Sequence, residues 1–93
     1  MLKVDYDAME TAATTLADQG DTFETCIETM GTVINGLPDI WEAETCTQYV
    51  SDFNEAKKTL TDVRDLIKDM SDQMKQISKN FRDADEDMKK QMQ

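Results

Sequence analysis

Apolar residues recur along this chain at alternating spacings of four and three residues, in two long runs. An α-helix turns once in about 3.6 residues, so this spacing places the apolar side chains of each run along one side of a helix. The pattern therefore predicts two long amphipathic helices with coiled-coil-like seams. The seam positions are Leu2, Tyr6, Met9, Ala13, Leu16, Gly20, Phe23, Ile27, Met30, Ile34 and Leu37 in the first run, and Cys46, Tyr49, Phe53, Ala56, Leu60, Val63, Ile67, Met70, Met74, Ile77, Phe81, Ala84 and Met88 in the second.

The segment 37–43 separates the two runs and holds the single proline and the single tryptophan of the chain. Pro38 lacks an amide donor and its ring clashes with a preceding helical turn, so the first helix is expected to end just before it. Asp39 and Glu42 stand three residues apart, as in a capping box, which predicts that the second helix begins here. Helices joined by so short a connection fold back on each other.

The predicted fold is therefore all-α, an antiparallel helix-turn-helix hairpin forming one domain over residues 1–93. Helix one is expected at about residues 5–36, the turn at about 37–39 and helix two at about 40–90, with a C-terminal tail that can fray. One hairpin of this length has a slender core, and we expect two hairpins to dimerise into a four-helix bundle.

Folding the two runs back about the proline predicts which seam residues meet. Gly20 is expected opposite Ala56, where two small residues let the helix axes approach closely. Phe23 is expected on Phe53, and Leu16 on Leu60. The residues expected at the centre of the core and of the dimer seam are Leu16, Gly20, Phe23, Phe53, Ala56 and Leu60.

In this register helix one covers helix two only as far as about residue 71, so about 20 residues of helix two are left over, roughly 30 Å. Phe81 and Met88 lie in this overhang and continue the seam. No other part of the chain is expected to cover them. The overhang therefore needs a partner, or it frays.

The chain is strongly acidic, with 20 acidic and 10 basic residues and a net charge of −10. This charge disfavours binding to nucleic acid or to an anionic membrane surface. No apolar run approaches the roughly 20 residues that span a bilayer, and the first residues turn acidic before a signal-peptide core could begin. Membrane insertion and a cleavable signal peptide are not expected.

The sequence offers little catalytic or metal-binding chemistry. It has no histidine, and its serines are predicted at polar helix positions without a base, so we expect no catalytic residue and no cofactor. Cys26 and Cys46 are expected to be free thiols acting as small core residues. Asp83, Asp85 and Asp87 are spaced like the start of a calcium loop, but Met88 stands where that loop needs glycine, so no metal is expected.

With its length, its two amphipathic helices and its tryptophan turn, the chain resembles the WXG family of small type VII secretion substrates. The Trp-x-Gly element is matched by Trp41, Glu42 and Ala43, with alanine in place of glycine. The family's C-terminal signature is an aromatic residue, an acid four positions on, and apolar residues three and seven positions further. It is matched by Phe81, Asp85, Met88 and Met92.

The resemblance implies a protein made in the cytoplasm and secreted without a cleavable signal peptide. It also implies dimers, with itself or with a related hairpin protein, and recognition of the C-terminal helix by the secretion ATPase. The leading interpretation is thus a non-enzymatic substrate or export partner of a type VII system.

Two alternatives stay open. The chain could be a helical chaperone of a larger type VII toxin, or a cytosolic coiled-coil scaffold unrelated to secretion.

Trp41 is expected to be buried at the turn end of the bundle. Phe81 and Asp85 are expected to act as an export signal, although Phe81 can also be a packing residue whose acidic neighbour is merely solvated.

Overall fold

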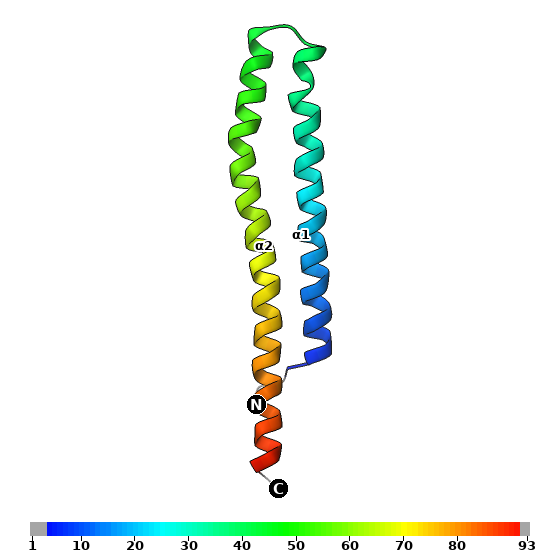
Figure 1. Cartoon of the computed structure of the whole chain (residues 1–93), viewed down its shortest axis with the longest axis vertical. Helices are drawn as coiled ribbons and strands as arrows, with labels where there is room; N and C mark the ends of the chain where they lie inside the picture. The colour runs from blue at the N-terminus through cyan, green and yellow to red at the C-terminus, as the bar shows by residue number, and fades with distance from the viewer. Residues whose placement is uncertain (1–3, 92–93) are drawn as a thin grey trace.

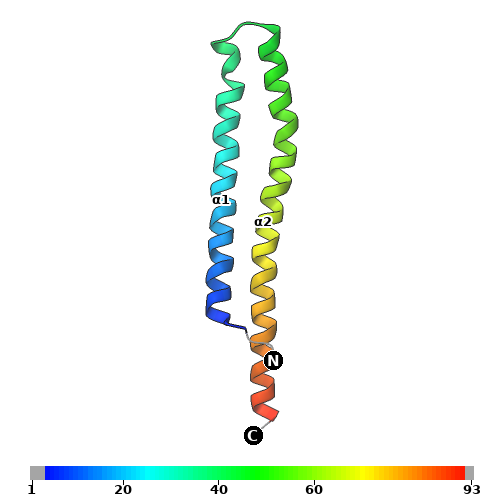
Figure 2. The same ribbon diagram turned by 180° about the vertical axis from the view of Figure 1, so that it is seen from behind.

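Two long helices lie side by side and antiparallel in the computed structural model, which describes residues 4–91 (Figure 1). Helix α1 spans Tyr6–Asn35, the 3-10 helix η1 spans Leu37–Asp39 and helix α2 spans Glu44–Gln91. The rod measures 76 × 17 × 17 Å, and the view from behind shows the same pairing along its length (Figure 2). The predicted all-α hairpin is confirmed. The predicted seam residue Leu2 and signal residue Met92 lie outside the described residues.

Helix α1 begins where the sequence supplies a cap. The Asp5 carboxylate accepts a hydrogen bond of 3.0 Å from the Ala8 amide, which satisfies one of the free donors of the first turn. At the other end the Gly36 amide donates to the Thr32 carbonyl at 3.1 Å. Helix α1 therefore occupies nearly the range that the spacing predicts.

The connection is longer than predicted, because α2 begins at Glu44 and not near residue 40. Asp39 belongs to η1, so the expected capping box between Asp39 and Glu42 at the start of α2 is wrong. The amides of Ile40 and Trp41 instead donate to the Leu37 carbonyl, at 3.0 and 2.8 Å, and close a turn before the chain crosses over.

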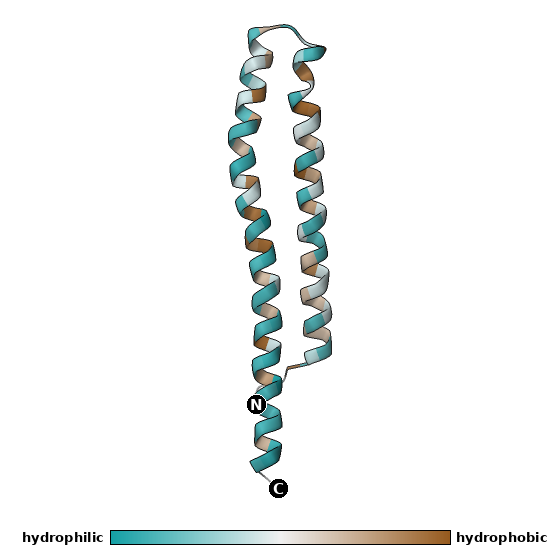
Figure 3. Ribbon diagram, viewed as in Figure 1, coloured by the Kyte–Doolittle hydropathy of each residue, from teal (hydrophilic) through white to brown (hydrophobic). Residues whose placement is uncertain are grey.

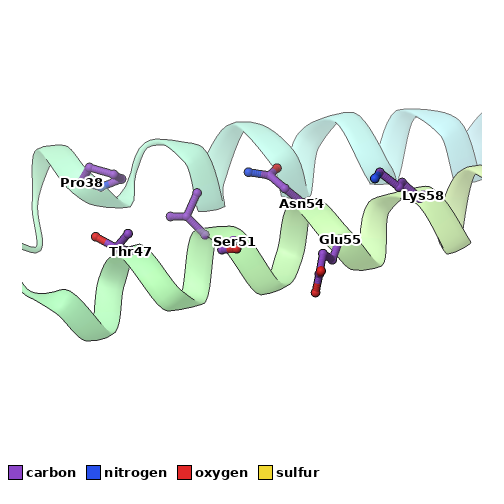
Figure 4. Close-up of a pocket in the computed structure, with 7 residues that line it drawn as sticks. Pro38, Thr47, Ser51, Asn54, Glu55 and Lys58 are labelled. Carbon is purple, nitrogen blue, oxygen red and sulfur yellow. The ribbon is translucent and has the colours of Figure 1, made fainter.

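As a result, η1 continues the rod past the end of α1 and lies beside the first turns of α2. Figure 4 shows Pro38 across from Thr47 and Ser51, at an open depression whose far rim carries Glu55 and Lys58. The first turns of α2 thus lie beside η1 as well as beside the end of α1. This shifts the register of the two long helices.

The shift replaces the predicted pairs. A Cβ on Gly20 would lie 3.2 Å from Cγ2 of Ile67, so the close approach at Gly20 is present but its partner is not Ala56, which is exposed. Phe53 lies against Gly31 and not against Phe23. A Cβ on Gly31 would lie 3.6 Å from Cε1 of the Phe53 ring. The helices are offset from the predicted register by two to three turns, at about 3.6 residues per turn.

The offset also lengthens the part of α2 that α1 covers. Tyr6, in the first turn of α1, contacts Phe81 and Asp85 of α2. The prediction that helix two is bare beyond about residue 71 is therefore wrong. Only the last turns of α2 extend past α1 (Figure 2). Within residues 4–91, neither helix is both long and apolar enough to cross a membrane.

Candidate interaction surfaces

The predicted apolar seam of α2 is divided between two sides of the helix. One set of seam residues, spaced seven apart, turns toward α1 and is buried or half-buried, and the other set is exposed along the whole helix. The inner set is Cys46, Phe53, Leu60, Ile67 and Met74. The exposed set is Tyr49, Ala56, Val63, Met70, Ile77 and Ala84. The hairpin therefore covers only half of the seam that the spacing predicts.

Exposed apolar residues of α1 lie beside the exposed set of α2. Tyr49 and the exposed Met30 and Val33 of α1 line adjoining depressions whose shared floor is Ile34 and Phe53. These side chains therefore lie on one side of the hairpin. Figure 3 shows the hydrophobic positions recurring along both helices between hydrophilic ones. We call this side the apolar face, formed by Met30, Val33, Tyr49, Ala56, Val63, Met70, Ile77 and Ala84.

The opposite side of the hairpin, the polar face, is crossed by bridges between the two helices. Arg64 pairs with Glu24 at 2.7 Å, and Lys68 pairs with Asp21 and Glu24 at 3.2 and 3.4 Å. The Lys68 pKa is raised, chiefly by the hydrogen bond to Asp21 and next by that to Glu24. Near the turn the side-chain amides of Asn35 and Asn54 exchange hydrogen bonds of 3.5 and 3.3 Å. The polar side chains named here are thus paired with each other within one chain.

Two serines lie in the contact between the helices. Ser71 and Ser78 are 1% and 0% exposed, so the prediction that they lie at polar positions of a helix is wrong. The Ser71 hydroxyl donates to the Ala13 carbonyl at 2.7 Å. The Ser78 hydroxyl is buried, and no hydrogen-bond partner is found for it among the described residues. Small residues here allow the close helix approach that Ala13 and Gly20 provide on α1.

The open end of the hairpin brings the first turn of α1 onto the predicted export signal. The Tyr6 hydroxyl is shared between a carboxylate oxygen of Asp85 and the Phe81 carbonyl, the latter at 3.1 Å. The hydrogen bond to Asp85, helped by partial burial, raises the pKa of Tyr6 above its usual 10.0. The upward shift extends the range over which this hydroxyl is a donor to higher pH.

An arginine on the next position of α2 holds the tyrosine ring. The Arg82 guanidinium carbon lies 5.3 Å from the centre of the Tyr6 ring, within cation–π range. The same guanidinium pairs with Glu10 at 3.3 Å and with Asp7 at 3.5 Å. We call the group Tyr6, Asp7, Glu10, Phe81, Arg82 and Asp85 the end cluster.

The chain is similar over almost its whole length to one protein family. Residues 1–86 match the WXG100 family, described as proteins of 100 residues with WXG. The chain belongs to the WXG100 family. WXG100 proteins are non-enzymatic secreted substrates, typical of type VII (ESX) secretion, and commonly pair as dimers. Comparison with curated proteins and with solved structures gave no match.

The WXG100 match confirms the expectation of a non-enzymatic protein of this family. It also bears on the turn element, which reads Trp41, Glu42 and Ala43 in this chain. All three residues lie in the connection before α2. No residue from 4 to 91 has a positive φ, so Ala43 fits its position without the conformational freedom of glycine.

Trp41 is 37% exposed in the single chain, so one hairpin alone does not bury it, and its burial at the turn end of the bundle stays a prediction. It precedes α2 and packs edge-on against Tyr49, with ring centroids 6.0 Å apart and an angle of 60°. Because Tyr49 belongs to the apolar face, Trp41 extends this face toward the turn. In the single chain the tryptophan of the WXG element is thus a surface residue.

Of the predicted signal residues and the cysteines within residues 4–91, most are exposed and one is buried. Phe81 is 36% and Met88 60% exposed, and Asp85 is also exposed. Both cysteines are free, but only Cys46 is buried, so the core position expected for Cys26 is wrong. Among residues 4–91, no three histidine, cysteine or acidic side chains are grouped as metal ligands.

Proposed function

We propose that this WXG100 protein is a substrate or export partner of a bacterial type VII secretion system, made in the cytoplasm and released as a folded dimer. The observation that supports this most is the apolar face, whose α2 residues are exposed from Tyr49 to Ala84. That distance corresponds to about 50 Å of helix at about 1.5 Å per residue. An apolar strip of this length is typical of an interface between helices.

The proposed occupant of the apolar face is a second copy of the chain. If the second α2 lies antiparallel along the first, the exposed residues match in size, with each large side chain against a small one and two medium ones at the centre. The facing pairs are Tyr49 with Ala84, Ala56 with Ile77, and Val63 with Met70. A surface that complements itself in this way favours a two-fold dimer. A related hairpin protein is the other partner that the dimer test would reveal.

The export signal is proposed to be the C-terminal part of the chain, with Phe81, Asp85, Met88 and Met92 read by the secretion ATPase. The exposure of Phe81, Asp85 and Met88 supports this, because a ring and a carboxylate one helical turn apart offer a partner groove both an anchor and a charge. The Phe81 ring and the Asp85 carboxylate must both be accessible to the ATPase while a second copy of the chain covers the apolar face.

The test is the appearance of the intact protein in the culture medium of an unlysed bacterium with a working type VII system. Asp85→Asn removes the charge but keeps an acceptor for Tyr6, so it should fold and dimerise normally, yet remain in the cells. Asp87→Asn is the matched control, the same change on a neighbouring exposed residue of α2, and should be secreted. Normal secretion of Asp85→Asn would contradict the proposed signal. Retention of the unchanged chain would favour a cytosolic scaffold.

A further inference from the structure

The first turn of α1 meets α2 at the exposed Phe81 and Asp85, across sequence separations of 75 and 79 residues. We propose that Tyr6 is a positioning residue for the export signal, whose hydroxyl fixes the Asp85 carboxylate in the orientation that the secretion ATPase binds. This inference rests on the proposed function. It makes the signal a feature of the folded hairpin and not of the C-terminal helix alone.

The need for positioning follows from where Asp85 lies. Beyond Asp85 the last turns of α2 have no α1 beside them, and an unpacked helix end is only marginally stable in water. A carboxylate on a fraying end is spread over many orientations, and ordering it on binding costs conformational entropy. Tyr6 ties this position to α1 through both the side chain of Asp85 and the backbone of Phe81.

The tyrosine is itself held in place. Arg82 lies over its ring at 5.3 Å and is paired with Glu10 at 3.3 Å and Asp7 at 3.5 Å, both from the same end of α1. The ring therefore lies under a guanidinium that acidic side chains of α1 hold in place. These contacts limit the positions that the hydroxyl can take. The hydroxyl is able to donate throughout the neutral range, because a tyrosine ordinarily keeps its proton there and the pKa of Tyr6 is raised further by the hydrogen bond to Asp85.

The contact also leaves Asp85 able to bind a partner. Tyr6 engages one carboxylate oxygen, Oδ2, and a carboxylate offers about four acceptor positions. Asp85 remains exposed, and the half-exposed Phe81 ring lies one turn before it. A lysine or arginine of the ATPase beside an apolar pocket would fit a carboxylate and a ring presented at this fixed spacing.

The test compares the affinity of full-length variants for the purified cytosolic domain of the secretion ATPase, well below their melting temperatures. Tyr6→Phe removes only the hydroxyl and should weaken binding about five- to tenfold, the scale of one ordinary hydrogen bond. Ser71→Ala also removes an interhelical hydrogen bond, but far from the signal, and should leave the affinity unchanged.

The outcomes separate this inference from the proposed function. If Asp85→Asn binds normally, the proposed signal itself is wrong. If Asp85→Asn loses binding while Tyr6→Phe binds like the native chain, only the positioning role is overturned. Tighter binding by Tyr6→Phe would also overturn it, because the hydroxyl would then mask Asp85. Equal weakening by Tyr6→Phe and Ser71→Ala would show an effect of stability alone, and would again contradict it.

Discussion

The two faces of the hairpin flank the same helix contact but are completed in different ways. On the polar face, side chains from one helix find partners on the other, as in the pairs of Arg64 with Glu24 and of Asn54 with Asn35. On the apolar face, the residues of α2 are aligned at equal intervals and remain exposed. The polar face thus stabilises the contact between the two helices of one hairpin, whereas the apolar face favours association with another molecule.

The same contrast explains why this chain can be ordered as one hairpin without having a thick core. The buried positions along the contact are mostly small, among them Ala13, Gly20, Gly31, Cys46 and Ser71. Small residues bring the helices close but bury little apolar area, so the larger side chains are left on the flank. Burial of that flank in a dimer would add the hydrophobic stabilisation that a single hairpin lacks.

The largest effect is expected from a charge at the centre of the apolar face. Met70→Glu places a carboxylate opposite Val63 in each copy of the proposed dimer, where it must be desolvated without a partner. We expect dimer dissociation to become at least about a hundredfold easier, a loss of roughly 3 kcal/mol. Sedimentation equilibrium measures this directly. Gln76→Glu adds the same charge on the outer surface of α2 and should leave the dimer intact.

Trp41→Ala tests how far the apolar face extends toward the turn. For a tryptophan fully buried in the core, this change would cost about 3–5 kcal/mol. Trp41 is 37% exposed and packs on Tyr49, so we expect a loss of about 2 kcal/mol or less. Urea unfolding followed by circular dichroism gives the value. A loss of core size would indicate that Trp41 is buried in the assembled state.

The two buried serines provide a matched pair for the contact itself. Ser71→Ala removes the donor to the Ala13 carbonyl and should lower the free energy of unfolding by about 1 kcal/mol. Ser78→Ala removes a buried hydroxyl for which residues 4–91 provide no partner, and should be neutral or slightly stabilising. Equal losses from both would mean that a bound water satisfies Ser78. Thermal melting of both variants under one condition decides between these outcomes.

The smallest effect concerns pH at the end cluster. The pKa of Tyr6 is raised by its hydrogen bond to Asp85, so the unfolded chain loses this proton at lower pH than the folded one. The contribution is therefore complete below about pH 10 and is lost as the pH rises through the higher folded pKa. Tyr6→Phe should reduce this alkaline loss of stability. The raised pKa of Lys68 acts in the same direction and remains in the variant. Melting curves measured from neutral to alkaline pH would show the difference, and identical pH dependence would contradict it.

The helices themselves follow from the apolar spacing, but their register does not. The spacing is the same whichever turns meet, so the register depends on the connection, and here the capping argument at Asp39 placed α2 too early. The amides of Ile40 and Trp41 bond to Leu37 instead, and the added residues move Gly20 from Ala56 to Ile67. Local motifs could not decide between the two turns.

The residues that the sequence-based predictions missed were missed for two different physical reasons. Ser71 and Ser78 look solvated by residue type, but they lie seven residues apart on one line of α2, which is the signal that could have placed them in the contact. The contact of Tyr6 with Asp85 depends wholly on the register, so no pattern within either helix indicates it. The seam identified part of the side of α2 that contacts α1, whereas the full contact required the three-dimensional structure.

The central claim is that the apolar face pairs with a second copy of this chain. Sedimentation velocity of the native protein alone, at about 10 μM, tests it most directly, since an interface of this kind should be populated at that concentration. The account predicts a single species with twice the chain mass of 10.6 kDa. A single species of 10.6 kDa would contradict it and would favour a different partner for the apolar face.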